Sequence, residues 1–153
     1  MEVLDKGENM RLWHQKLIPY LPRQQLLGQH RECCALRGKG WGKKHATVDY
    51  VFTHDPARLV AYHHLAMNEM ERRGYHPDTT WRNGTWRGST LGESTEELWK
   101  KCRVNAVVYM LAAEKTGAMI YPEHNDEYLR ECIDNLRDKG IDVSEMERLI
   151  NNV

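Results

Sequence analysis

The stretch of sequence that decides the fold is PRQQLLGQHRECCALRG, which spans residues 22–38. Its apolar and half-polar positions recur at the i, i+3, i+4 spacing of an α-helix, through Leu26, Leu27, His30, Cys33, Cys34 and Arg37. Pro22 suits the first position of a helix, because its missing N–H would have no partner there. Three glycines from Gly38 to Gly42 stop the pattern, so we predict a helix over about Pro22–Leu36.

A second helix is expected from Asp55 onward. Asp55 can cap it, and Pro56 fits its first turn. One apolar stripe then continues through Leu59, Tyr62, His63, Ala66, Met67 and Met70. Gly74 ends this helix, as a C-terminal glycine usually does. The short apolar piece before it, Thr47–Phe52, is expected to be a strand or an extended link.

The second half of the chain predicts a long irregular stretch followed by further helices. Residues 75–93 contain several turn-forming residues and no periodicity. Ser94 and Glu97 have the spacing of a capping box, which predicts a long helix to about Glu114. The last two helices are expected at about Glu123–Lys139 and from Ser144. With no hairpin signal, residues 10–153 are predicted to form one all-α domain of four to five helices with long irregular loops.

Composition places the protein among ordinary globular chains. It has 153 residues, 41% of them hydrophobic, with 22 basic and 22 acidic residues and a formal net charge of zero. No segment has the length of a membrane span, and the polar start does not resemble a secretory signal. None of the four cysteines forms a CxxC pair, so we expect reduced, mostly buried thiols and a cytoplasmic protein.

Glu32 is the residue with the most unusual sequence context, because it is the only acidic residue between Met10 and Lys44. A single glutamate on a helix is more often an ion-pair partner than a catalyst. Here it shares its helix with basic and amide side chains, which suit phosphate and base-edge contacts around one acid/base group. The net charge is zero, so any DNA-binding face must come from this local excess of basic residues.

These residues also carry a resemblance to a known family. The segments LGQHRECCALRG and VFTHDPARLVAYHHLAMNEMERRGYHP resemble the pyrimidine-dimer DNA glycosylases, most closely a bacterial branch that begins MRLWHQ. The resemblance covers Met10–Pro77 well and Ile120–Ile141 more weakly. It implies a DNA-repair enzyme that flips a nucleotide out of the duplex and attacks its deoxyribose with a terminal amine, assisted by a glutamate.

By this resemblance Glu32 takes the role of the assisting glutamate. A terminal α-amine has a pKa near 7.7–8.0, so about a tenth of it is neutral and nucleophilic at pH 7. Arg11 stands at the matching distance from Glu32, but nine residues precede Met10. We therefore expect residues 1–9 to be a disordered extension or a misassigned start, and the nucleophile to be the amine of Met10 or, after trimming, that of Arg11.

The expected partner is double-stranded DNA with a damaged, modified or abasic nucleotide. By resemblance Arg31 binds phosphate and Gln24 lies near the DNA. With the other basic and aromatic candidates, the predicted DNA contacts are Arg23, Gln24, Arg31, Arg37, Lys43, Lys44, Arg82, Trp86 and Arg87.

Two alternatives stay open at this point. One is a helical DNA-binding module without catalysis. The other is a metal-dependent hydrolase, for which the eight histidines suggest His14, His30 and a carboxylate as ligands. No histidine spacing matches a metal motif, so the leading interpretation needs no metal or cofactor. The oligomeric state is left open.

Overall fold

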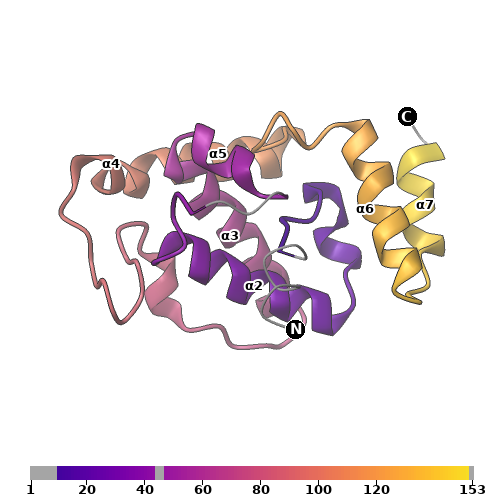
Figure 1. Ribbon diagram of the computed structural model, residues 1–153, viewed down its shortest axis with the longest axis horizontal. Helices are drawn as coiled ribbons and strands as arrows, with labels where there is room; N and C mark the ends of the chain where they lie inside the picture. Colours follow the sequence, from indigo (N-terminus) through magenta and orange to yellow (C-terminus); the bar gives the residue numbers. More distant parts are fainter. Residues whose placement is uncertain (1–9, 44–46, 152–153) are drawn as a thin grey trace.

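The computed structural model describes residues 10–43 and 47–151, and within them the chain is helical with no sheet (Figure 1). The prediction of an all-α domain is confirmed. The elements are η1 (Gln15–Tyr20), α2 (Arg23–Arg37), η2 (Asp49–Thr53), α3 (Pro56–Arg72), η3 (Thr79–Arg82), α4 (Glu97–Lys100), α5 (Cys102–Thr116), α6 (Asp126–Asp138) and α7 (Ser144–Asn151), where η denotes a 3-10 helix. None of the helices in this part of the chain combines the length and hydropathy of a membrane span.

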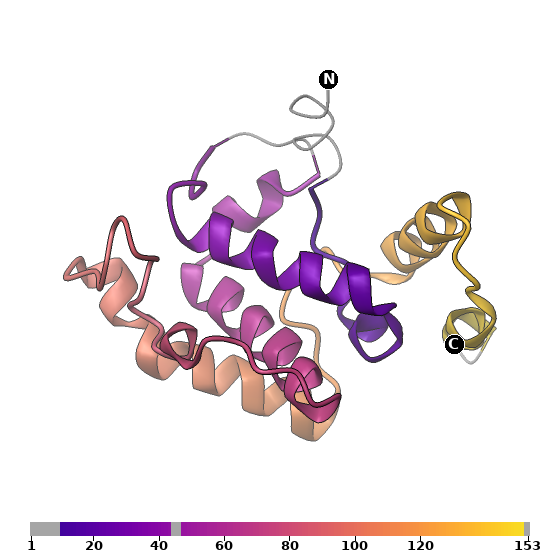
Figure 2. The same cartoon turned by 90° about the horizontal axis from the view of Figure 1, so that it is seen from below.

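Helix α3 is the centre of the domain. It packs between α2 on one side and α5 on the other (Figure 2). The sequence predicts one apolar stripe on α3, yet Val60 and Ala61, which lie outside that stripe, are as fully buried as Leu59. A helix that is apolar on most of its sides belongs in the interior, with neighbours on more than one face.

The last two helices form a pair at one end of the molecule. Helices α6 and α7 pack against each other (Figure 1). Helix α7 also contacts η1. Met146 on α7 is 2% exposed and belongs to the hydrophobic core. Helix α7 therefore completes the core within its own chain.

The local signals at the ends of α3 act as predicted. The Asp55 side chain accepts a hydrogen bond from the Ala57 backbone N–H at 2.8 Å, and Pro56 opens the helix. Gly74 follows the helix with a positive φ of 90°, a conformation that glycine adopts without steric cost. Cys33, Cys102 and Cys132 are buried free thiols, and Cys34 is half-buried.

The long helix predicted from Ser94 to Glu114 is wrong in its first part. Ser94 Oγ instead accepts from the Glu96 N–H at 3.2 Å, and α4 is a separate turn that ends before Lys101. The short α4 places the Trp99 ring in the interior, 5.3 Å from the Trp41 ring in an edge-to-face contact. Burial of this large ring is worth more than one capping box.

Two further boundaries differ from the sequence prediction. The segment Thr47–Phe52, expected to be extended, forms the 3-10 helix η2 and buries Val51 completely. Helix α6 begins at Asp126 rather than Glu123, because the Asn125 side chain accepts the Tyr128 N–H at 2.9 Å and caps the helix there. The predictions for residues 1–9 and for Lys44 lie outside the described residues.

Candidate nucleic-acid site

Gln29 joins the beginning of the described chain to α2. Its Oε1 accepts the Trp13 N–H at 2.7 Å, and its Nε2 donates to the Arg11 carbonyl at 2.9 Å. The same Nε2 group donates its second hydrogen to Glu32 Oε1 at 3.1 Å. Because a carboxamide has two donors and a strong acceptor, this single buried side chain holds residues 11–13 next to Glu32.

Tyr62 adds a third element to this arrangement. Its hydroxyl, on α3, lies 2.5 Å from the Trp13 carbonyl oxygen and 2.8 Å from Gln29 Oε1. The hydroxyl has one hydrogen, which these two acceptor oxygens share. Tyr62 and Gln29 are both fully buried, so the contact is shielded from water and helps to hold the segment in place. Gln29 is not among the residues predicted from the sequence. Its only signal there is that it lies three residues before Glu32, on the same helix face.

The Glu32 carboxyl has a perturbed protonation equilibrium. Burial raises its pKa to about 8, although Arg31, the Arg11 backbone N–H and guanidinium, and Lys139 each favour the charged form. At pH 7 the group is therefore mostly protonated and can give up a proton, and slightly above that pH it can accept one. A carboxyl that titrates near the working pH is suited to acid/base catalysis.

Arg11 hydrogen-bonds to Glu32 through its backbone, whereas its side chain acts on Glu32 only through its charge. The guanidinium points to α6, where it pairs with Glu131 Oε2 at 3.2 Å and lies 5.9 Å from the centre of the Tyr128 ring. The residue is 8% exposed. The side chain of Met10 packs against the core, and its carbonyl accepts a hydrogen bond from the Thr47 hydroxyl.

The solvent face of α2 carries three of the predicted DNA contacts. Arg23, Gln24 and Arg31 are all exposed, and Gln24 and Arg31 are seven residues apart, which places them on one face two turns apart. Gly28 lies between them, and a Cβ there would meet the Arg31 guanidinium at 3.7 Å. Between these two side chains, the polar surface of α2 is therefore not raised by a side chain at position 28. Lys43, just beyond the helix, is also exposed.

Arg37 is a correction to the predicted DNA contacts. It is 0% exposed, and its guanidinium donates to three backbone carbonyl oxygens in the irregular stretch, at 2.8 Å to Trp81, 2.8 Å to Asn83 and 3.1 Å to Trp86. These hydrogen bonds from its two terminal nitrogens hold the stretch against α2. Arg37 Nε has no hydrogen-bond partner but is buried, so no phosphate can reach it in this conformation.

The other arginines of the irregular stretch are also engaged within the protein. Arg87 donates to the carbonyls of Arg37 at 2.8 Å and Gly38 at 3.0 Å and lies over the Trp99 ring. Arg82 pairs with Glu71 at 2.8 Å. Trp86 is half-buried. For Arg82 and Trp86 a role in DNA contact stays a prediction, whereas Arg87 has a structural role already.

One group among the described residues has metal-ligand spacing, namely His30, Cys34 and His63. His30 and Cys34 are four residues apart on α2, a pattern that the sequence analysis overlooked. His30 Nδ1 lies 2.8 Å from His63 Nε2, and Cys34 Sγ lies 3.9 Å from the same His63 atom. The trio suggested from sequence does not form there, because His14 stacks instead on His124 at 5.3 Å.

Hydrogen bonding argues against a metal in this group. Arg37 lies 3.0 Å from His63 Nδ1, and a guanidinium can only donate. Neutral His63 must therefore carry its proton on Nε2, where it donates to His30. Burial, with Arg37 nearby, also holds the pKa of His63 well below its usual value. The cluster is a chain of hydrogen bonds, and the buried cation beside it would repel a metal ion.

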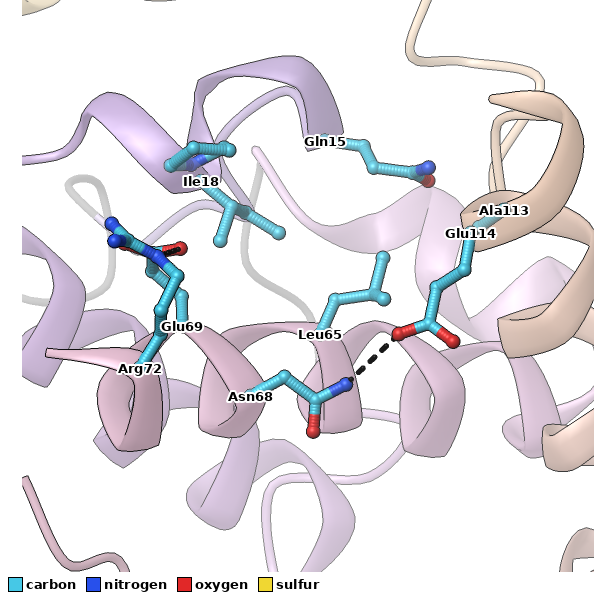
Figure 3. A pocket seen from close by; sticks show the side chains of 9 residues that line it. Gln15, Ile18, Leu65, Asn68, Glu69, Arg72, Ala113 and Glu114 are labelled. Atoms are coloured by element: carbon cyan, nitrogen blue, oxygen red, sulfur yellow. Dashed lines mark hydrogen bonds and ion pairs between the residues drawn. The ribbon is translucent and has the colours of Figure 1, made fainter. Parts of the chain in front are cut away.

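A cavity of about 240 Å³ lies elsewhere, between η1, α3 and α5 (Figure 3). Ile18 and Leu65 form its apolar wall. Its charged side chains pair with neighbours, Glu69 with Arg72 at 3.0 Å and Glu114 with Asn68 at 3.2 Å. None of the residues predicted to act on DNA lines it. We therefore do not place the reaction in this cavity.

The half-buried Glu32 carboxyl, with its raised pKa, lies against the backbone of residues 11–13, on the helix that exposes Arg23, Gln24 and Arg31. The chain was also compared with known families. Residues 10–83 match the family described as pyrimidine dimer DNA glycosylase, which confirms the resemblance over that segment. The family's description indicates a role in DNA repair. No curated protein and no solved structure matches the chain.

Proposed function

We propose that this protein is a DNA N-glycosylase with abasic-site lyase activity, which removes a damaged or modified base by attack of a terminal amine. The observation that carries the proposal is the position of Glu32, whose carboxyl is held by Gln29 against the backbone of Arg11. A chain that began at Met10 or Arg11 would place its α-amine within a residue of this carboxyl. Pyrimidine dimers are the lesion that the family description suggests.

The chemistry needs one amine and one carboxyl. The neutral amine attacks C1′ of the extruded nucleotide, and the bond from C1′ to the base breaks as the protonated Glu32 gives its proton to the departing base. The proton that the attacking amine releases passes to O4′ as the bond from C1′ to O4′ breaks, and the opened sugar is joined to the protein by a protonated imine at C1′. The Glu32 carboxylate then removes a proton from C2′, and the 3′ phosphate leaves in a β-elimination that cleaves the strand.

The DNA contacts of the proposal lie on the exposed face of α2. Arg23 and Arg31 bind phosphates on either side of the target, and Gln24 contacts the DNA between them. Extrusion of the nucleotide is needed because the duplex otherwise covers C1′. The free thiols fit a reducing compartment, and we propose that the enzyme acts in the cytoplasm without a cofactor.

The direct test is borohydride trapping on a duplex with one abasic site. Two versions of the protein are compared, one beginning at Met1 and one at Met10, each with a Glu32→Gln control. We expect a covalent adduct from the Met10 version, because its amine is free. The Glu32→Gln variant should form far less strand-cleavage product, because no carboxylate removes the C2′ proton.

One observation favours a second candidate function. Whenever residues 1–9 precede Met10, the nitrogen of that residue is an unreactive peptide amide. The protein would then bind DNA without catalysis. If neither version is trapped while both bind abasic DNA with strong salt dependence, the lyase proposal is wrong and this binding function replaces it.

A further inference from the structure

A second cavity, of about 310 Å³, lies between the irregular stretch 75–93, α3 and α5. Arg82 of the stretch and Arg103 of α5 both line it, and none of its lining residues is acidic. A cleft lined by charges of one sign focuses their field and concentrates ions of the opposite sign. The cavity does not include Glu32 and shares no lining residue with the cavity in Figure 3. It is therefore a separate candidate site for an anion.

His64 of α3 adds a hydrogen-bond donor of fixed identity to this cavity. Arg82 Nη1 lies 3.0 Å from His64 Nδ1, and a guanidinium can only donate, so neutral His64 carries its proton on Nε2. Burial, together with the charges of Arg82 and Arg37, lowers the pKa of His64 to about 4, so the ring is neutral at pH 7. Within the described part of the chain Nε2 has no hydrogen-bond partner. This N–H is therefore left for a ligand.

The charges around the cavity favour an anion with a single charge. Arg82 pairs with Glu71 at 2.8 Å. Arg103 is exposed and forms no ion pair with the described residues, and Glu93 acts on it only through charge. One cation without an ion pair balances one negative charge, which is what each phosphodiester of DNA carries. A phosphomonoester carries nearly two at pH 7, so it fits the cavity less well.

The cavity borders the same irregular stretch that lies along α2. Arg23, on the exposed face of α2, stacks on Tyr75 at 5.5 Å, and Arg37 donates to the carbonyls of Trp81 and Asn83. Figure 2 shows the stretch running between α2 and α5. A DNA duplex, with two backbones on either side of a major groove about 12 Å wide, is broader than one α-helix of about 10–12 Å. A duplex on α2 therefore extends over the stretch toward the cavity.

We infer that this cavity binds a phosphodiester of the DNA backbone, as a second contact outside the exposed face of α2. The inference rests on the proposed function, because it takes DNA as the substrate. Arg103 binds the phosphate oxygens, and Arg82 and the His64 Nε2–H are further donors to them. Val107 and Met110 supply apolar surface for the adjoining deoxyribose. The contact fixes the position of the duplex and reads no sequence.

The salt dependence of duplex binding by the full chain tests the contact. Arg103→Ala should weaken binding about 5–10-fold at about 0.1 M salt and should make the logarithmic salt slope shallower by about 0.9. Lys115→Ala removes one positive charge from an exposed position at the other end of α5, so it is the matched control and should change affinity less than about twofold. Thermal unfolding of Arg103→Ala should match that of the wild type, because the side chain is exposed.

Nuclear magnetic resonance identifies the source of the phosphate. The backbone amide signals of Asn83 and Gly84 should shift when the duplex is added to the wild type, and should shift less in Arg103→Ala. Inorganic phosphate at about 5 mM should give no comparable shift, because a single contact without the rest of the duplex is weak. Shifts with inorganic phosphate but not with the duplex would overturn the assignment to DNA.

These results separate this inference from the proposed function. If Arg31→Ala weakens duplex binding while Arg103→Ala keeps the affinity and salt slope of the wild type, DNA is bound by α2 without the cavity and the inference is wrong. If Arg103→Ala has the expected effect while neither version of the protein is trapped by borohydride, the cavity binds DNA and the lyase proposal alone is wrong.

Discussion

Glu32 and Arg37 lie on the same helix, and burial affects their side chains in different ways. Burial raises the pKa of Glu32 to about 8, which brings it into the range where it exchanges protons. Burial also lowers the pKa of Arg37, to about 10, but this group stays charged at pH 7. Arg37 tolerates its position because backbone carbonyl oxygens surround its guanidinium.

The perturbed pKa of Glu32 predicts a pH-dependent effect of Glu32→Gln on stability. The folded-state pKa of about 8 lies above the ordinary 4.5, so the native protein holds a proton that the unfolded chain releases between these values. Native stability therefore falls as pH rises through this window. Glutamine does not titrate. The free energy of unfolding of the variant should therefore exceed that of the wild type by about 1–3 kcal/mol at pH 8.5 and should equal it at pH 4. Urea unfolding at both pH values measures this, and equal differences would disprove the buried-acid assignment.

Arg31 and Arg37 predict opposite consequences of the same substitution. Arg37→Ala leaves three backbone carbonyls without donors and should destabilise the fold by about 3–5 kcal/mol. Arg31→Ala removes an exposed side chain and should change stability by less than about 0.5 kcal/mol, while it weakens DNA binding. Thermal unfolding and DNA titration of both variants separate the two roles. Retained stability in Arg37→Ala would contradict the structural role given to it here.

At the scale of elements, the irregular stretch 75–93 is positioned by close backbone packing as well as by Arg37. A Cβ at Gly84 would lie 3.0 Å from the Cys102 carbonyl oxygen and 3.2 Å from the Cys102 Cβ. The start of α5 is therefore in direct contact with this stretch. Only a residue without a side chain permits that approach.

Gly84→Ala is accordingly expected to destabilise the protein by about 1–3 kcal/mol, because either the stretch or the first turn of α5 must move. Ser89→Ala, at an exposed position of the same stretch, is the control and should be neutral. Urea unfolding of the two variants gives the comparison. If Gly84→Ala proved as stable as Ser89→Ala, the stretch would not pack against α5 in solution as described.

At the scale of the whole molecule, zero net charge means that DNA binding depends on where the charges lie. Arg23, Arg31 and Lys43 are exposed around α2. If these three neutralise phosphates, the logarithm of the DNA-binding constant should fall with the logarithm of salt concentration with a slope of about −2.7. Fluorescence anisotropy at several salt concentrations measures the slope, and Arg31→Ala should make it shallower by about 1. A slope near zero would remove α2 as the DNA-binding face.

The sequence by itself determined the parts that depend on neighbouring residues. The ends of α3 are set by the Asp55 cap, by Pro56 in the first turn and by Gly74 after the last. Each of these acts within one helical turn, so it can be recognised in the sequence without knowledge of the fold. The all-α class and the family resemblance were predictable for the same reason: periodicity and motifs are local patterns. Glu32 was singled out because its neighbours in sequence are basic.

Tertiary structure alone decided the rest. Whether an arginine on α2 faces water, as Arg31 does, or the interior, as Arg37 does, depends on which segments pack against the helix from more than forty residues away. The role of Gln29 depends on residues 11–13 returning to its helix, and the break before α5 follows from burial of Trp99. Whether a residue is buried depends on contacts with residues that are remote along the chain, so local sequence patterns could not specify these outcomes.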